Sequence, residues 1–534
     1  MEKKSRIFVP CSTNKVLKLC QDLTNFLFSI QLYFVRLYNL IFLYISKKRK
    51  DAALFMSKKI KDFLQSTFLY TVYLFFVRHF RKFKSWLIKA TNPLYRFYTF
   101  RLLFPSAYRR AARKPVDEKK VVFIELRLPS LTNSFKLMYD TLYINYDFDI
   151  HCHFLRNTYV NRKTYRKNCV KMLKDIATAK YVFFDEATNV TSHVKFRPET
   201  VITQLWHGCG AFKKFGYSTA DAIFGASRKD MDKYPFNRGY TNVTVSSPEV
   251  IWAYEEAMNY SHESGVVKAL GSSRTDIFYN KDFIAKAYET LYSVMPQAKG
   301  KKVILYAPTF RGRVAKARTP NVLSPEFMKY VLGNEYVLLM KHHPLVRKRP
   351  KIPEVCADFA RDVTDEMTIE DLLCVSDICI SDYSSLVFEY SLFERPMIFL
   401  AHDLEEFFDW RGFYYDYFEL TPGPVFKSTT EVIEYIQNID RLFDKERVRA
   451  FREKFMSSCD GHATERIMDV MFGKALESHK RAEPLPEKPY HLIPHSEDFV
   501  VEEQNEDSDD DESENKDGAE STQTDSDEKS ESEE

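Results

Sequence analysis

Two series of short apolar segments, each followed by a loop and a helix-like stretch, constrain the fold of this chain more than any other feature. Such alternation is typical of parallel sheets built from βαβ units. The sequence therefore predicts an α/β protein with two doubly wound parallel-sheet domains facing one cleft, divided near residues 275–300. The first series is VVFIEL (121–126), YVFFDEA (181–187) and VITQLW (201–206), with AIFGAS (222–227) and VVKALG (266–271) as possible additions. The second series is KKVILYAPTF (301–310), EYVLLMKHHP (335–344), DICISDYSS (377–385) and RPMIFLAHD (395–403).

The length of 534 residues supports more than one domain. Single cores stop growing beyond roughly 250–300 residues, and 45% of this chain is hydrophobic, which is ample for sizeable cores. We expect an N-terminal Rossmann-like domain over residues 116–275 and a C-terminal one over residues 276–480. A basic aromatic region, 1–115, precedes them, and a proline-bearing linker with a disordered acidic tail, 481–534, follows.

The net charge of +4 hides a strong asymmetry along the chain. Residues 1–115 hold 24 Lys and Arg against 4 Asp and Glu, whereas residues 497–534 hold 19 Asp and Glu against 2 Lys. The tail has almost nothing apolar to bury, so it cannot offset its chain entropy and is expected to be disordered. It either solubilises the protein or shields the basic region electrostatically.

The basic region is also rich in Phe, Tyr and Leu, with cations interrupting its apolar runs. The longest uncharged runs, Leu23–Val35 and Phe63–Val77, are shorter than the roughly 18–20 residues of a spanning helix. This pattern favours amphipathic helices in the interface of an anionic membrane surface. The alternative is a helical domain whose aromatic stripe packs against its neighbour. A nucleic-acid-binding arm is disfavoured because such arms are rarely so apolar.

Several site classes are excluded by the absence of their motifs. The 9 cysteines form no CxxC pair, which argues for a reducing compartment and against a structural zinc site. The opening MEKKSRIFVPCSTNK lacks the apolar segment of a secretory signal. No Walker loop, GxGxxG, HExxH or DxD-type cluster follows a predicted strand, so neither a metal nor a cofactor is expected.

Polar side chains gather after four of the predicted strands, where open α/β sheets bind ligands. Each residue alone is more often structural, but donors suited to phosphate at all four strand ends indicate an anion site. Asp382 can orient a turn in which the two following serines and free backbone N–H groups meet a pyrophosphate, although a plain helix cap would look the same. The residues are His207, Lys213 and Lys214; Thr309 and Arg311; Lys341, His342 and His343; and Asp382, Ser384 and Ser385.

Six blocks in order resemble the CDP-glycerol glycerophosphotransferases, which build teichoic-acid-type polymers on the cytoplasmic face of bacterial membranes. The resemblance covers roughly residues 120–475. It departs from the family pattern at Cys209-Gly210-Ala211 and at Gly271-Ser-Ser-Arg274-Thr-Asp276. The blocks are QLWHGCGAFKKFG, GSSRTDIF, ILYAPTFRG, MKHHP, ISDYSSLVFEYSLFERPMIFLAHDLEEF and RGFYYDYFELTPGPV.

The resemblance implies a GT-B fold and a peripheral membrane enzyme. It would move glycerol phosphate from a CDP-glycerol donor to a lipid-linked polyol-phosphate acceptor and release CMP. His207 and His343 fall on the family's motif histidines. We expect His207 to be the general base, because a histidine titrates near working pH. The two lysines of 213–214 are expected to hold the acceptor phosphate, and the second-domain residues to balance charge on the leaving group.

Arg411 falls in the Arg-Gly-Phe-Tyr block and is a weaker candidate, since it could equally pair with Asp409 or Glu405. Three alternatives stay open on sequence alone. The donor could be CDP-ribitol; the enzyme could be a GT-B glycosyltransferase that uses a nucleotide sugar for capsule or lipid-linked glycan; or the chain could be a non-catalytic peripheral scaffold.

Overall fold

The computed structural model describes residues 90–156, 160–223, 225–312 and 317–486, together with His79 and Trp86. The side chains of residues 409–411 are outside this description. The chain divides into two compact units, Met1–Tyr95 and Arg96–Glu534, and the second contains everything described below. Most of the predicted amphipathic region and all of the acidic tail lie outside the described residues. Within the described part, no helix has both the length and the hydropathy that crossing a membrane requires.

The first sheet has six parallel strands in the order β2-β1-β3-β4-β5-β6. Residues of β1 alternate between its two faces, with Val121 and Phe123 in one core cluster and Val122 and Ile124 in the other. A strand buried on both faces reads as a continuous apolar run, which is how the sequence shows it. The strands are β1 (Asp117–Glu125), β2 (Asp149–Phe154), β3 (Ala179–Phe184), β4 (Val201–Gln204), β5 (Asn242–Thr244) and β6 (Val267–Lys268).

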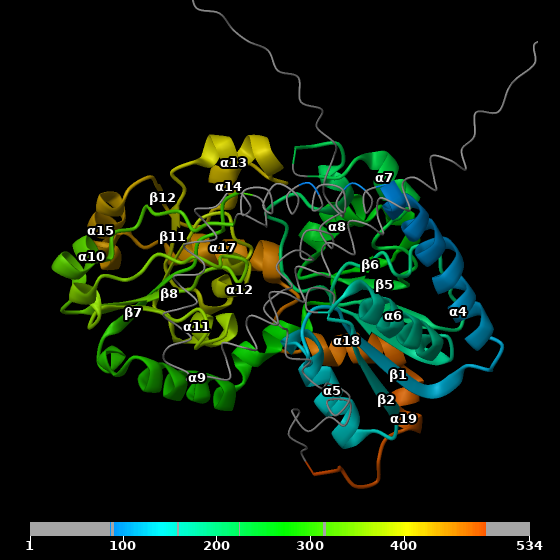
Figure 1. Ribbon diagram of the computed structural model, residues 1–534. Helices are drawn as coiled ribbons and strands as arrows, with labels where there is room; N and C mark the ends of the chain where they lie inside the picture. Colours follow the sequence, from blue (N-terminus) through cyan, green and yellow to red (C-terminus); the bar gives the residue numbers. More distant parts are fainter. Residues whose placement is uncertain are drawn as a thin grey trace, which may run out of the picture. The chain divides into compact units, whose positions relative to one another are not determined.

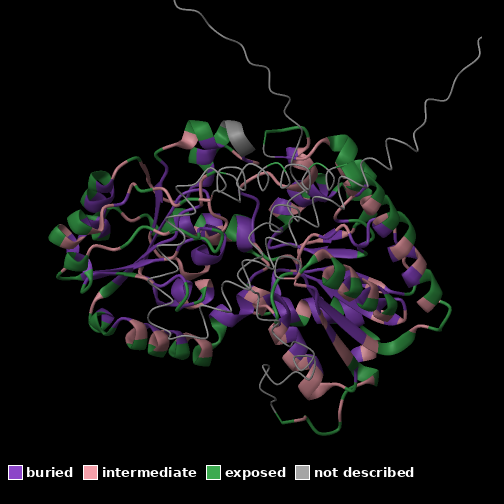
Figure 2. Ribbon diagram, in the orientation of Figure 1, coloured by how far each residue is buried: buried purple, intermediate pink, exposed green. Residues whose placement is uncertain are grey.

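Helices cover both faces of this sheet (Figures 1 and 2). On one face, α4 (Phe104–Ala111) packs against α6 (Arg162–Ile176), and Phe104 joins the core there. On the other, α5 (Asn133–Asn145) and α18 (Ala463–Phe472) cover the strands. The fold of this half is therefore doubly wound, as predicted.

The second sheet is also parallel and six-stranded, in the order β12-β11-β10-β7-β8-β9. One face is covered by α9 (Lys281–Val294) and α11 (Ile369–Val375), the other by α10 (Pro325–Leu332) and α15 (Thr429–Gln437). The strands are β7 (Lys302–Tyr306), β8 (Tyr336–Met340), β9 (Ala360–Asp362), β10 (Ile378–Ser381), β11 (Met397–Leu400) and β12 (Val425–Phe426).

The remaining helical segments connect these layers. They are the π-helix η1 (Phe97–Leu103), the 3₁₀ segments η2 (Gly216–Thr219), η3 (Pro248–Val250), η4 (His262–Ser264), η5 (Ser273–Tyr279), η6 (Pro296–Ala298), η8 (Glu354–Cys356) and η9 (Ser391–Phe393), and the helices α7 (Arg228–Lys233), α8 (Ile251–Met258), α12 (Leu386–Tyr390), α13 (Leu404–Arg411), α14 (Tyr417–Leu420), α16 (Ile439–Leu442), α17 (Lys445–Met456) and α19 (Lys474–Ser478).

One predicted strand is wrong. In AIFGAS (222–227), the described residues 222–223 and 225–227 form no strand and lead into α7. Asp221 has φ 63°, and a Cβ added at Gly225 would lie 1.7 Å from the carbonyl oxygen of Thr219, so the backbone folds tightly back on itself here. Four strands escaped prediction because they are short or carry polar residues: β2, β5, β9 and β12.

Two helices pack in the core of the first sheet although the sequence places them in other domains. Residues 463–478 were assigned to the second domain, yet Ile467 and Phe472 of α18 pack against Val121 and Phe123 of the first sheet. Likewise α4 falls within the predicted N-terminal region 1–115, but its Phe104 belongs to the core of the first sheet. We keep the predicted boundaries as a proposal with these two amendments.

The strand orders define where each half would bind a ligand. Consecutive strands step outward in both directions from β1 and β3 in the first sheet, and from β7 and β10 in the second. Open α/β sheets bind ligands outside the carboxyl ends of the strands at such topological switch points. The candidate site is therefore built from the loops after these four strands and after β4, which lies next to β3.

Candidate active site

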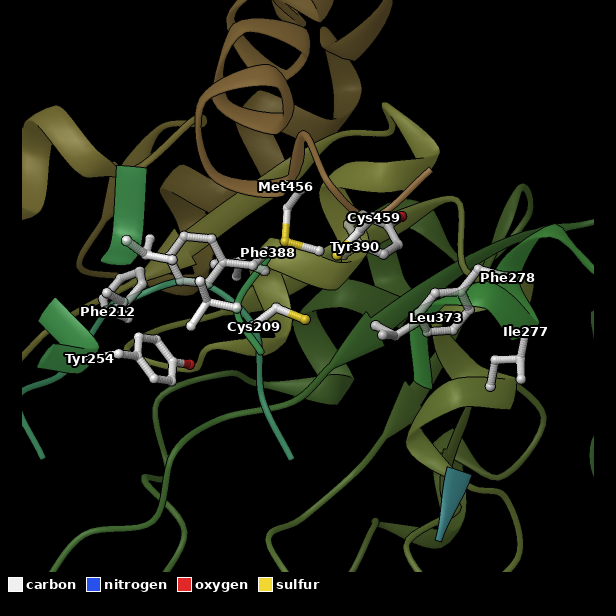
Figure 3. Close-up of a cluster of buried hydrophobic side chains, with 14 of the residues drawn as sticks. Cys209, Phe212, Tyr254, Ile277, Phe278, Leu373, Phe388, Tyr390, Met456 and Cys459 are labelled. Carbon is white, nitrogen blue, oxygen red and sulfur yellow. The ribbon is translucent and has the colours of Figure 1, made fainter. Parts of the chain in front are cut away.

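The turn after β4 carries His207 and has a constrained backbone. Trp206 adopts φ 59°, a left-handed conformation that costs a non-glycine residue about 1–2 kcal/mol, and its ring stacks on His207 with centroids 4.7 Å apart. Gly210 has φ 64°, and an added Cβ would lie 2.3 Å from the ring of Phe388. Figure 3 shows Cys209 close to Phe388 within the buried cluster. The glycine thus lets the turn pack directly on α12 of the other half.

His207 is held through one ring nitrogen. Its Nδ1 lies 3.2 Å from the carbonyl oxygen of Asp185 and 3.3 Å from Oε1 of Glu186. A carbonyl only accepts hydrogen bonds, so we infer that Nδ1 carries the proton and that Nε2 is the basic nitrogen. This is the arrangement that a general base requires.

The surroundings of His207 keep its ring neutral. Desolvation by the surrounding protein, together with the positive charge of Arg127, lowers the pKa of His207 to about 4. The side chain is nevertheless 43% exposed, so solvent screens part of this effect. The imidazole is therefore uncharged and accessible at neutral pH.

Two buried carboxyl groups lie beneath this histidine, at the ends of β1 and β3. Glu125 accepts hydrogen bonds from the backbone N–H groups of Arg127 and Leu128, at 2.9 and 3.0 Å. Asp185 accepts a 2.7 Å hydrogen bond from the hydroxyl of Thr132. Burial and the neighbouring Glu125 raise the pKa of Asp185 well above its usual range. Burial and the neighbouring Glu125 therefore favour the protonated form of the Asp185 carboxyl.

The end of β10 organises the second switch point. Asp382 accepts hydrogen bonds from the backbone N–H groups of Thr309 at 2.8 Å and Tyr383 at 2.6 Å, and it pairs with Arg311 at 2.9 Å. Arg311 also binds Asp403 through two hydrogen bonds of 2.5 and 2.9 Å. Arg311 is thus fully engaged by two carboxylates. Its guanidinium holds the loops in place. These contacts favour a structural role for Arg311 over the predicted contact with substrate.

Thr309 and the two serines are the groups left to meet a ligand. The Thr309 hydroxyl is buried and has no hydrogen-bond partner within the described residues. Ser384 and Ser385 are partly exposed at the start of α12. This helix has only 5 residues, so its macrodipole contributes little to anion binding. The hydroxyls and backbone N–H groups at this turn remain as hydrogen-bond donors to an anion.

Residues of the two halves also meet through the backbone and side chains close to the His207 turn. A Cβ added at Gly208 would lie 3.7 Å from the Oγ of Ser385. The backbone of Lys213 forms an antiparallel bridge with Phe413, and the N–H of Lys214 donates to the carbonyl of Gly412 at 3.1 Å. These contacts bring the WHG block, the Asp-Tyr-Ser-Ser block and the Arg-Gly-Phe-Tyr block together, as the sequence predicts for a shared site.

His343 faces the same region from the second half. Desolvation, together with the positive charges of Lys213 and Arg127 of the first half, lowers its pKa to about 4. A neutral imidazole close to two cations from the other half can donate a hydrogen bond to a phosphate oxygen. Its neighbour His342 instead turns into the interior, where its Nδ1 lies 3.0 Å from the hydroxyl of Thr319.

Lys341 is the predicted site residue that the geometry favours least for ligand contact. Its ammonium donates to the backbone carbonyls of Thr364 at 2.8 Å and Met367 at 2.5 Å. It secures the loop that follows β9. Arg411 is the last residue of α13, and its side chain is outside the described residues, so its predicted role stays a prediction.

A buried ionic cluster joins the His207 turn to helices of the second half. Arg274, in η5, donates a hydrogen bond to the carbonyl of His207. It also donates to Oε1 of Glu370 in α11 at 2.7 Å and lies 3.4 Å from Oε1 of Glu389 in α12. Burial raises the pKa of Glu389 to about 7, although Arg274 opposes the rise. The cluster fixes the position of the turn relative to the second sheet.

The sequence interpretation missed the groups that surround His207 most closely. Glu125 is near the end of the first predicted strand and Arg127 follows it, and Asp185 and Glu186 are near the end of the next, so the same strand-end rule would have found them. Arg274 and its glutamates lie too far apart in the chain for any local pattern to join them. Among the described residues, no three His, Cys, Asp or Glu side chains are grouped to hold a metal ion.

Comparison with known proteins identifies relatives of this arrangement. A family model described as CDP-Glycerol:Poly(glycerophosphate) glycerophosphotransferase matches residues 106–473. A teichoic acid poly(ribitol-phosphate) polymerase of Bacillus spizizenii is 36% identical over 372 residues, covering 69% of this chain and 58% of the polymerase. A teichoic acid ribitol-phosphate primase of the same organism is 34% identical over 377 residues, covering 69% of this chain and 95% of the primase. The chain thus spans little more than half of the first relative and nearly all of the second.

A glycerol-phosphate enzyme and a solved structure are also similar. A teichoic acid glycerol-phosphate primase of Bacillus subtilis is 28% identical over 312 residues, covering 57% of this chain and 77% of the primase. A structure of the wall teichoic acid polymerase TagF has a TM-score of 0.59 at 20% identity, covering 74% of this chain and 98% of that one. The expected GT-B type fold, with two parallel-sheet domains, is confirmed.

Proposed function

Because the chain belongs to the CDP-glycerol:poly(glycerophosphate) glycerophosphotransferase family, we propose that it transfers a polyol phosphate from a CDP-linked donor to an acceptor hydroxyl. The reaction releases CMP and extends or primes a teichoic-acid-type polymer. One observation carries the proposal: a neutral, accessible histidine on one switch point lies beside the serine turn of the other. A base next to an anion-binding turn is what transfer to a hydroxyl needs.

In the proposed mechanism, an acceptor hydroxyl attacks the phosphorus that bears the polyol. The new bond joins the acceptor oxygen to this phosphorus, and the bond from the phosphorus to the bridging oxygen breaks. The hydroxyl proton passes to Nε2 of His207, and CMP leaves with the electron pair of the broken bond. The hydrogen bond from Nδ1 of His207 to the carbonyl of Asp185 keeps Nε2 directed at the acceptor.

The second half would stabilise the charge that develops on the leaving CMP. The unpartnered hydroxyl of Thr309, the serines at the start of α12 and the ring of His343 are its free donors. Lys213 adds a positive charge from the first half, close enough to lower the pKa of His343. Preorganised donors of this kind are worth about 10²–10³ in rate each when they face the developing charge.

The donor can be narrowed to two candidates. The six motif blocks indicate CDP-glycerol as the donor, and the name of the family model supports this donor. A specific observation favours CDP-ribitol. Two relatives named for ribitol phosphate are 36% and 34% identical over 69% of this chain. Enzymes named for glycerol phosphate are 27%, 30% and 28% identical over 52–57% of it, or 36% identical over only 33%. The two donors differ only in the length of the polyol, so the mass of the product separates them.

A competition assay tests the proposal. Purified protein is mixed with equal CDP-glycerol and CDP-ribitol, with and without a short lipid-linked polyol-phosphate acceptor, and CMP and product mass are measured. Acceptor-dependent CMP release is expected, and the added mass names the polyol. Release from a nucleotide sugar, with neither CDP-polyol consumed, would contradict the proposal and favour a glycosyltransferase.

We also propose that the protein works at the cytoplasmic face of the cell membrane, held by anionic lipids through its basic region. The cations of residues 1–115 support this. Because Phe104 and Tyr108 belong to the core, a test must spare α4 and remove only residues 1–95. Loss of sedimentation with anionic vesicles is expected, with CMP release from a water-soluble acceptor retained. Undiminished sedimentation would contradict the attachment.

A further inference from the structure

Arg127 occupies a position that the mechanism above does not use. It is the second residue after β1, at the switch point of the first sheet, and its side chain is 53% exposed. Its backbone N–H is fixed by Oε1 of Glu125 at 2.9 Å, so the base of the side chain is anchored while its guanidinium reaches toward solvent. A half-exposed arginine at a switch point is suited to bind a phosphate in two-pronged fashion.

A chain of three groups connects this arginine to the proposed base. The guanidinium of Arg127 donates a hydrogen bond to Oε1 of Glu186. The same oxygen lies 3.3 Å from Nδ1 of His207. Arg127 and His207 therefore share a single carboxylate oxygen. Whatever draws Arg127 away leaves Glu186 free to interact with the imidazole alone.

The charges around His207 give this sharing a consequence. The ring is faced by Glu125 at the end of β1 and Arg127 in the loop after it, by Asp185 and Glu186 in the loop after β3, and by Arg274 from η5. Arg127 and Arg274 disfavour the imidazolium, and Glu125 favours it. A ring with a pKa of about 4 is a weak base, since the most efficient general base has a pKa near the working pH. An anion bound to Arg127 would offset the positive charge of this side chain and raise the pKa of His207 toward that optimum.

We propose that Arg127 binds a phosphate of the polyol-phosphate acceptor and that this contact releases Glu186 to His207. Glu186 then balances the imidazolium that forms when His207 takes the hydroxyl proton. The base is weak in the empty site and strengthens only when the anionic acceptor is present. This inference rests on the proposed function for the identity of the acceptor, but the coupling itself is a property of the three side chains.

The same coupling between Arg127, Glu186 and His207 would limit hydrolysis of the donor when no acceptor is bound. With no acceptor phosphate bound, Arg127 keeps Glu186 engaged and His207 is a poor base, so activation of water against the donor is slow. Arg127 also lowers the pKa of His343 in the other half. Neutralising Arg127 therefore affects both histidines in the same direction, toward a higher pKa.

The test measures the pKa of His207 directly. The full chain is labelled with ¹⁵N-histidine, the His207 signal is assigned from a His207→Gln variant, and its titration is followed with and without glycerol 3-phosphate as the probe. In the wild type, the probe is expected to raise the pKa of His207. In Arg127→Met the pKa is expected to be raised already and to respond little to the probe.

Two further variants separate the parts of the chain of contacts. Glu186→Gln is expected to bind the probe as tightly as the wild type but to show a smaller shift, because the counter-charge is missing. Arg361→Met is the matched control: Arg361 makes an exposed two-pronged pair with Glu366 in the second half and should behave as the wild type.

Kinetics give an independent reading. Arg127→Met should raise KM for the acceptor by about 10- to 100-fold, the usual range for a lost hydrogen bond to a charged group, with donor KM unchanged. Equal probe binding and an equal pKa shift in Arg127→Met and wild type would overturn the inference. A wild type that releases no CMP from either CDP-polyol would instead overturn the proposed function, and the titration would still decide the coupling.

Discussion

The two switch points occupy equivalent places in two sheets of the same size, yet they carry opposite chemistry. The first gathers carboxyl groups, those of Glu125, Asp185 and Glu186, around one histidine. The second pairs Arg311 with Asp382 and Asp403 and presents hydroxyls instead. Under the proposed function, the first half moves a proton and the second holds an anion. The fold fixes where the two sites meet, and the strand-end side chains decide what each does.

Removing one histidine from each half is expected to have the largest effect and to show whether the two halves have different roles. His207→Ala should lower kcat by about 10²–10⁴-fold with donor binding unchanged, because it deletes the proton acceptor. His343→Ala should raise donor KM, because it removes a ligand of the anion. Steady-state CMP release and donor binding by calorimetry measure both effects. His262→Ala, whose side chain is 82% exposed and pairs only locally with Glu255, is the control. If both site variants lost donor binding equally, the two halves would not be divided as proposed.

The next largest effect concerns stability in the anion-binding half. Arg311→Met leaves Asp382 and Asp403 buried without their cation, so we expect a loss of about 3–5 kcal/mol in the free energy of unfolding of that half. Thermal and denaturant unfolding, followed by fluorescence, measure it. The exposed Arg361–Glu366 pair provides the contrast: Arg361→Met should cost no more than about 1 kcal/mol. A similar small cost at Arg311 would return it to the list of direct substrate ligands.

The apolar strands could be predicted from sequence because burial on both faces leaves a continuous run of Val, Ile, Leu and Phe, as in KVILY of β7. β2 escaped because its DIHCHF sequence places histidines and an aspartate on the sheet edge, and β12 has only 2 residues. The histidines of the site were found because motif and strand end coincide. The contact from Arg274 to the His207 turn was not, since it spans 67 residues and depends on how the halves pack.

A smaller effect tests the contact that joins the halves at the histidine turn. Gly210→Ala places a methyl group 2.3 Å from the Phe388 ring and requires an unfavourable φ, so it should cost roughly 1–3 kcal/mol through overpacking, with some loss of kcat as His207 shifts. Gly265→Ala has a similar positive φ but nothing within 4 Å, and it isolates the conformational cost alone. Thermal midpoints of the two variants give the difference. Equal midpoints would mean that α12 yields easily and does not fix the turn.

The smallest effect lies away from both switch points, at the outer edge of the first sheet. Asp175 accepts hydrogen bonds from Nδ1 of His151 at 2.7 Å and from Nε2 of His153 at 2.8 Å. The hydrogen bond to Asp175 raises the pKa of His151, so its stabilising contribution is complete below the unfolded pKa of about 6.5 and is lost as pH rises through the folded pKa. We expect the thermal midpoint of the wild type to fall slightly across this window. Asp175→Asn should flatten that dependence by no more than about 1 kcal/mol, while leaving the pH profile of CMP release unchanged. A changed rate profile in this variant would mean that the carboxyl-rich character of the first half extends beyond the switch point, and that proton handling is not confined to the His207 turn.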